Sequence, residues 1–168
     1  EGTKKKNGME LSAALQTLAS SIQVYADLEY SGASLNALDD KLDATLSILA
    51  DVLQEPAFNE TDVERVRKNL QNSIFTEKDN LRQTADKVFR CVLFGDAYLG
   101  QWQRGTHESI QGITRDDLVQ WHQAVWQPKN IGITVVSGMN QDVIQASLEK
   151  VFGPWQSAAA PLENLVVK

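Results

Sequence analysis

The sequence predicts an α+β fold in which an antiparallel sheet is flanked by helices. Three observations indicate this class. The apolar residues change from a helical period to strict alternation near residue 21 and return to a helical period near residue 42. The expected elements run helix, hairpin, several helices, strand and helix, rather than as regular βαβ units. A chain of 168 residues with 42% hydrophobic side chains can also bury its own core.

The first expected element is a helix over residues 8–20. Asn7 can accept hydrogen bonds at its N-terminus, and Glu10 three residues later completes a capping box. The apolar stripe of this helix consists of Leu11, Leu15, Leu18 and Ala19.

A β-hairpin is expected next, because apolar and polar residues alternate between Ile22 and Tyr30. The turn is placed near Asp27–Glu29, and the return strand runs to about Leu38.

Three helices are predicted after the hairpin. The first begins at Leu42 and is stopped by Pro56, and the second opens at Asn59 or Thr61. The third runs from Leu81 to Phe94 and is ended by Gly95. It is expected to bury Ala85, Val88, Phe89, Cys91, Val92 and Leu93.

The remaining chain is predicted to hold a loop, two helices and one strand. Residues 95–105 form the loop, anchored by Tyr98 and Trp102. A helix begins after Thr114 and ends before Pro128, a third strand covers 131–136, and a last helix follows Asn140. Residues 1–155 are expected to form one lobe and 156–168 a linker or tail.

Composition excludes several classes of function. Sixteen Lys and Arg against 22 Asp and Glu give a net charge of −6, which argues against a nucleic-acid partner. No apolar run approaches the roughly 20 residues of a membrane span. A single cysteine excludes an internal disulfide and a cysteine-rich metal site.

Residues suited to catalysis are few. His107 and His122 are 15 residues apart and lack the short spacing of a zinc-ligand pair. An exposed or helix-capping His107 and a half-buried His122 beside Trp121 are therefore expected. Cys91 lies among apolar residues and is expected to be a buried hydrophobe rather than a reactive thiol. The acidic pairs at 39–40 and 116–117 are placed to begin helices. The tryptophans are expected to pack a core and its rim: Trp102, Trp121, Trp126 and Trp155.

Several stretches, taken in order, nevertheless resemble one lobe of the insulinase, pitrilysin and mitochondrial-processing-peptidase family of zinc metallopeptidases. They span about residues 1–155. The stretches are Glu1–Leu11, Ser34–Phe58, Val63–Arg67, Leu93–Asp96, Gly105–Ile110, Ile113–Leu118 and Trp126–Gly138.

The resemblance implies a metallopeptidase-lobe fold, incomplete here at its N-terminal side, and a partner lobe. Two such lobes close around a peptide, and one carries His-x-x-Glu-His, whose histidines and a distal Glu hold zinc. This motif would lie before residue 1. The distal ligand position falls on Ser73, which does not replace a carboxylate, and a shifted alignment nominates Glu77.

The opening Glu-Gly-Thr is similar to lobes that have lost the zinc motif. The resemblance therefore implies a non-catalytic lobe, without metal or catalytic residues of its own, that encloses and selects peptide beside a zinc-bearing lobe. The edge Ile22–Tyr30 is a candidate to pair with an extended peptide. Two alternatives stay open: a structural domain without proteolysis, as in core subunits of a respiratory complex, and a catalytic lobe that uses Glu77. A periplasmic or otherwise exported location is expected, with the cytoplasm as the alternative.

Overall fold

The computed structural model describes residues 2–27, 29–77, 79–102 and 104–156. The described residues form two compact units. One unit contains those within 1–24, 33–58 and 116–168, and the other those within 25–32 and 59–115. The predicted tail at 156–168 lies outside the described residues, apart from Gln156.

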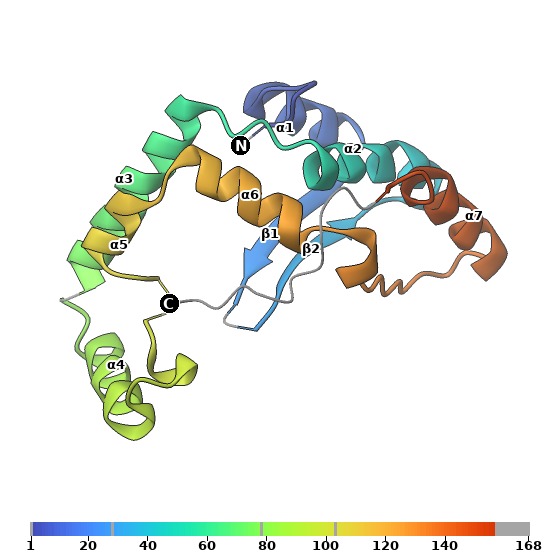
Figure 1. Cartoon of the computed structure of the whole chain (residues 1–168). Coiled ribbons are helices and arrows are strands. Elements are labelled where there is room, and N and C mark those ends of the chain that lie inside the picture. The colour runs from blue at the N-terminus through green and yellow to red at the C-terminus, as the bar shows by residue number, and fades with distance from the viewer. Residues whose placement is uncertain (1, 28, 78, 103, 157–168) are drawn as a thin grey trace. The chain divides into compact units, whose positions relative to one another are not determined.

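The first unit packs helices against the base of a β-hairpin (Figure 1). Strands β1 (Ser21–Ala26) and β2 (Ser31–Asn36) form a two-stranded antiparallel sheet, so the predicted hairpin is confirmed. The helical elements of this unit are α1 (Gly8–Thr17), η1 (Asp39–Lys41), α2 (Leu42–Gln54), α6 (Arg115–Val125), η3 (Pro128–Asn130) and α7 (Gln141–Phe152).

The core of the first unit is one face of α2. Leu46, Leu49 and Leu53 are buried at spacings of three and four residues, which places them on one helical stripe. Partly buried side chains from β1, β2, α7 and the end of α6 close around them: Ile22, Ala33, Leu35, Leu42, Trp126, Leu148, Val151, Phe152 and Trp155. The expectation that Trp126 and Trp155 pack a core is therefore confirmed.

Two of the predicted helix caps are present in the first unit. The Asn7 side chain accepts the Glu10 N–H and the Glu10 carboxylate accepts the Asn7 N–H, which is the expected capping box. The Asn140 side chain accepts the N–H of Asp142 at the start of α7. Helix α1 ends at Thr17 rather than at residue 20, because Ala19 adopts a positive φ of 47° as the chain turns into β1.

The second unit contains α3 (Glu60–Glu77), α4 (Leu81–Phe94), η2 (Tyr98–Gly100) and α5 (His107–Gly112). The predicted bounds of α4 are confirmed. Its C-cap Gly95 has φ 56° and ψ −130°, a conformation open to glycine. The side chain of Arg67 on α3 binds the backbone carbonyls of Ile110 and Ile113 around the end of α5.

Two further structural expectations are wrong. The predicted strand at 131–136 is not a strand, because a strand needs a neighbour to exchange backbone hydrogen bonds, and β1 and β2 pair only with each other among the described residues. The apolar face of α4 is exposed rather than buried, because within the described residues nothing covers it. Its exposed members include Leu81, Val88, Phe89, Cys91, Val92 and Leu93.

Across the described residues, none of the helices combines the length and apolar character needed to cross a membrane.

Candidate functional site

Ser73 and Glu77 lie one turn apart near the C-terminal end of α3. The Ser73 hydroxyl donates to the Leu70 carbonyl at 2.8 Å, as serines inside helices commonly do. Glu77 is the last residue of the helix and lines a cavity in the second unit. The assignment of Ser73 to the distal-ligand position stays a prediction.

His122 lies on α6 in the first unit and has a structural role. Its Nε2 is 2.8 Å from the Leu53 carbonyl at the end of α2, and its ring meets the edge of Phe58 at 5.6 Å between centroids. Burial lowers the pKa of His122 below the usual 6.5, and the hydrogen bond to Leu53 opposes this effect. The expected half-buried histidine is confirmed, and its ring joins α6 to α2.

His107 and Cys91 are both exposed and both lie in the second unit. His107 is the first residue of α5, directly after the N-cap Thr106, so its expected exposure is confirmed. The prediction that Cys91 is buried is wrong, because it shares the uncovered surface of α4. Within the described ranges, no three His, Cys, Asp or Glu side chains gather closely enough to hold a metal ion. The His, Cys, Asp and Glu side chains of these ranges therefore do not fit a zinc site.

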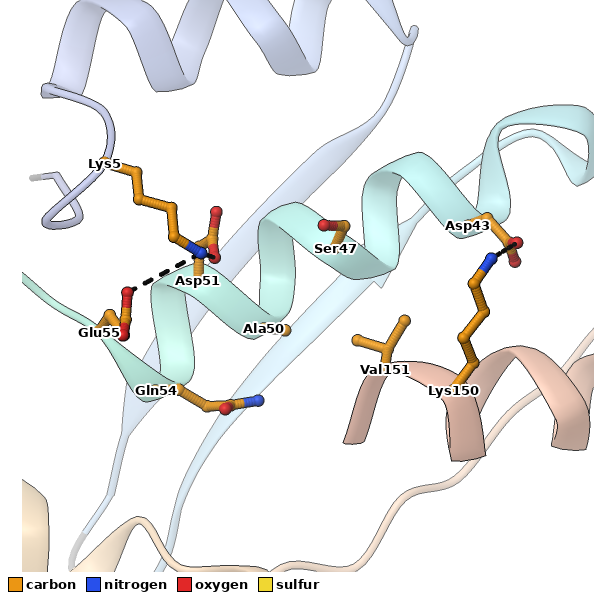
Figure 2. A pocket seen from close by; sticks show the side chains of 9 residues that line it. All are labelled: Lys5, Asp43, Ser47, Ala50, Asp51, Gln54, Glu55, Lys150 and Val151. Atoms are coloured by element: carbon orange, nitrogen blue, oxygen red, sulfur yellow. Dashed lines mark hydrogen bonds and ion pairs between the residues drawn. The ribbon is translucent and has the colours of Figure 1, made fainter. Parts of the chain in front are cut away.

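A cavity of about 450 Å³ in the first unit is lined by residues of α2, α7 and the chain before α1 (Figure 2). Its charges are already paired. The Lys5 ammonium lies 2.6 Å from Asp51 and 3.8 Å from Glu55, and Lys150 lies 3.1 Å from Asp43. Two lysines face three carboxylates here, which gives 2 − 3 = −1, and each lysine is already engaged by a carboxylate.

The pKa values in this cavity reflect the same pairing. The hydrogen bond to Asp51 raises the pKa of Lys5 above 10.5. Hydrogen bonds from Ser147 and Lys150 lower the pKa of Asp43 below 3.8. Lys5 therefore stays protonated and Asp43 stays ionised near neutral pH.

A second cavity, of about 840 Å³, lies within the second unit along α4. Three arginines and two carboxylates line its wall, and the aromatic rings of Phe89 and Trp102 line it as well. The Lys87 ammonium lies 3.8 Å above the centre of the Trp102 ring, which holds the chain after η2 against α4. The expectation that Trp102 anchors this loop is confirmed.

The outer edge of β1 is the remaining candidate surface. The Asp27 N–H donates to the Tyr30 carbonyl, and N–H groups alternate in direction along an antiparallel strand. The N–H groups of Gln23 and Tyr25 therefore point toward β2, and that of Val24 points to the open edge. Val24 is 60% exposed.

Gly32 on β2 is required by a close approach of an aromatic ring. A Cβ at this position would lie 2.5 Å from the ring of Tyr25, which also stacks edge-on against Tyr30 at 6.2 Å. The glycine therefore lets the Tyr25 ring lie over the neighbouring strand.

Two features of the second unit are not predicted from the sequence. In the sequence, Arg67 is notable only as part of a stretch that resembles the family. The carbonyls that it binds lie 43 and 46 residues away, so no local pattern predicts these hydrogen bonds. The basic cavity joins residues from 77 to 104. The sequence shows Arg82 and Arg90 on one predicted helix, which indicates a basic helix surface. It does not show that the loop at 95–105 lies against this helix and closes a cavity with it.

Two family models match the chain in succession. Residues 1–98 match the one described as insulinase (peptidase family M16), and residues 112–167 match the one described as peptidase M16 inactive domain. The first match covers more than half of the chain. The chain therefore belongs to the M16 family of peptidases, as the motifs indicated.

Curated relatives agree with this assignment. Subunit alpha-1 of the mitochondrial-processing peptidase of Dictyostelium discoideum is 28% identical over 98% of the chain and 25% of its own length. An uncharacterized zinc protease of Streptomyces coelicolor is 22% identical over 96% of this chain and 36% of its own length. The human processing peptidase subunit beta is 23% identical over 91% of this chain and 31% of its own length. The chain thus spans about a quarter to a third of these relatives.

Solved structures show the same fold. The peptidase M16 inactive domain from Pseudomonas fluorescens superposes with a TM-score of 0.89 at 21% identity, over 98% of this chain and 40% of that one. The first half of the periplasmic protease PqqL from Escherichia coli gives a TM-score of 0.83 at 15% identity, over 98% of this chain and 37% of that one.

Proposed function

We propose that this chain is part of a non-catalytic lobe of a zinc-dependent M16 endopeptidase. In this role it encloses and selects peptide beside a lobe that carries His-x-x-Glu-His and zinc. The match of residues 112–167 to the M16 inactive domain carries the proposal. The predicted placement of the distal-ligand position on Ser73 supports it, since a serine hydroxyl is no substitute for a zinc-binding carboxylate, and in the structure this hydroxyl donates to the Leu70 carbonyl of its own helix.

The names of the relatives favour an enzyme made of two kinds of lobe. Two of them are named as alpha and beta subunits of mitochondrial-processing peptidases. Residues 1–155 would form the lobe and residues 156–168 a linker or tail. An exported, periplasmic location is proposed by analogy with the protease from Escherichia coli, whereas the processing peptidases are named as mitochondrial.

Reconstitution tests this proposal. Peptide hydrolysis is measured for the purified chain, for a separately expressed lobe with His-x-x-Glu-His, and for their mixture. We expect no hydrolysis by the chain alone and a clear gain in the mixture. Unchanged hydrolysis on addition of the chain would instead support a structural domain.

Metal analysis of a chain extended upstream of residue 1, after zinc loading and dialysis, separates the proposal from the catalytic alternative. A metal-free chain agrees with a non-catalytic lobe. Near-stoichiometric zinc that is lost in Glu77→Ala would assign the distal ligand to Glu77 and overturn the proposal.

The open edge of β1 is the proposed contact for an extended peptide. Val24→Pro removes an outward N–H without removing a hydrogen bond to β2, so it should weaken hydrolysis by the mixture severalfold. Val24→Thr keeps the N–H and should hydrolyse peptide normally. Equal activity of the proline and threonine variants would exclude this edge.

A further inference from the structure

We propose that the cavity along α4 binds the carboxylate side chains of an acidic stretch of peptide. The inference deepens the proposed function, because it assigns a substrate preference to the lobe that selects peptide. It concerns residues of the second unit alone: Arg82, Asp86, Phe89, Arg90, Trp102 and Arg104.

The charge of this cavity is opposite to that of the chain. Three arginines and two carboxylates, Glu77 and Asp86, line it, which gives 3 − 2 = +1. Lys87 beside Trp102 raises the local sum to +2, while the whole chain carries −6. Cations concentrated on one wall of an acidic protein attract anionic ligands to that wall.

Two of the guanidinium groups are available to a ligand. Arg90 is paired with Asp86 at 3.1 Å on the same helix. Arg82 and Arg104 form no ion pair or side-chain hydrogen bond with any residue that the structure describes. A guanidinium group binds a carboxylate through two parallel N–H···O bonds, so this pair suits neighbouring acidic side chains.

Trp102 provides a second observation that points to an oxygen ligand. Its indole Nε1 is buried and has no hydrogen-bond partner among the described residues. A buried donor without an acceptor is unfavourable, and the ring that carries it lines the cavity. Because Nε1 itself is buried, the Trp102 ring has to turn toward the cavity for a carboxylate or peptide oxygen to become the acceptor that this donor lacks.

The size and apolar surface of the cavity favour a peptide over a small inorganic anion. Its volume of about 840 Å³ lies in the range of pockets for organic ligands. Phe89 is 61% exposed there and offers contact to the methylene groups of Glu side chains.

Binding of a labelled polyglutamate peptide to the full chain tests the inference. Fluorescence anisotropy is compared for polyglutamate and for polyglutamine of the same length, at low and at high salt. We expect polyglutamate to bind, polyglutamine to bind at least about tenfold more weakly, and salt to weaken the first peptide. Equal binding of both peptides would overturn the inference.

Matched variants locate the site. Arg82→Gln and Arg104→Gln should each weaken polyglutamate binding about tenfold, and Trp102→Phe should weaken it by removing the N–H while keeping an aromatic ring. Lys129→Gln on η3 removes the same charge outside the cavity and should bind normally. Equal losses in Lys129→Gln and Arg82→Gln would show a nonspecific charge effect and overturn the assignment.

Two further outcomes separate competing explanations. If inorganic phosphate displaces polyglutamate at a concentration equal to that of the peptide, the cavity is a site for a small anion, and the inference is overturned. The assay needs neither zinc nor a second lobe. If the mixture of lobes hydrolyses peptide but the chain does not bind polyglutamate, only the acidic preference is excluded. If the chain binds polyglutamate but the mixture gains no hydrolysis, only the proposed function is excluded.

Discussion

Arg67 holds α5 to α3 through a single side chain. Its guanidinium group donates to the carbonyls of Ile110 and Ile113, and Nε pairs with Glu64 at 2.9 Å on the same helix. The side chain is 14% exposed, and its hydrogen bond to Ile110 is partly buried, whereas the bonds to Ile113 and Glu64 are exposed. Carbonyls at the end of a short helix have no partner in the helix itself, and Arg67 satisfies them.

Arg67→Met should destabilise the second unit by about 2 kcal/mol, because it removes charge-assisted hydrogen bonds and leaves carbonyls unpaired. Urea unfolding measures the change, and hydrogen exchange should show faster exchange in α5. Arg65→Met, two residues earlier on the same helix, removes an exposed arginine that pairs with Asp62 and should cost less than about 0.5 kcal/mol. Equal losses in the two variants would contradict the role of Arg67.

His122 makes the stability of the first unit depend on pH. Burial lowers its pKa in the folded chain below the ordinary 6.5, so the unfolded chain binds more protons between these two values. The contribution is fully present above about pH 7 and is lost as the pH falls from 6.5 through the lowered pKa.

Urea midpoints at about pH 8 and about pH 5.5 check this prediction. The chain should be less stable at the lower pH, and His122→Gln should reduce that difference while weakening the contact with the Leu53 carbonyl. His107→Gln, at an exposed position, should leave the difference unchanged. A pH dependence unchanged by His122→Gln would assign the effect to other groups.

At the scale of elements, three helix ends are predicted correctly because their signals are local, whereas α1 ends at Thr17 and not at the expected residue 20. The Asn7 capping box, the Asn140 cap and the end of α4 at Gly95 all depend on residues within one turn of the helix end. The strand expected at 131–136 and the buried face of α4 depend on partners that sequence periodicity does not supply. Alternation shows which residues suit a sheet, but not whether a neighbouring strand is present.

Gly95 and Gly112 provide a test of helix ends on neighbouring elements. Gly95→Ala forces a Cβ into a backbone conformation with φ 56° and should cost about 1–3 kcal/mol. Gly112 is the last residue of α5, and a Cβ there would meet open space, so Gly112→Ala should be neutral or slightly stabilising. Thermal unfolding compares the two variants, and equal effects would contradict the backbone explanation.

At the scale of the molecule, the uncovered apolar side chains are the largest departure from the sequence expectation. Leu81 and Val92 on α4 are 83% and 81% exposed, and Val136 is 97% exposed. Periodicity identifies these residues as parts of apolar surfaces that favour burial. Which surface covers them is information that a single chain does not contain.

The uncovered face of α4 predicts that the isolated chain binds a hydrophobic dye and associates as its concentration rises. Leu81→Glu with Val92→Lys should lower dye fluorescence severalfold and favour the monomer in sedimentation. Ser12→Glu with Thr17→Lys changes exposed polar positions on α1 and should leave both readouts unchanged. Dye binding that persists in the α4 variant would place the dye-binding surface elsewhere.

The segment between η3 and α7 determines how the first unit responds to proteolysis. Backbone amides of residues 132–136 form no hydrogen bonds with the described residues, so they should exchange with solvent rapidly and admit a protease. Helix α7 is nonetheless held by Val151 and Phe152 in the core and by Lys150 on Asp43. A nicked chain should therefore keep both pieces together on a sizing column and separate only in denaturant.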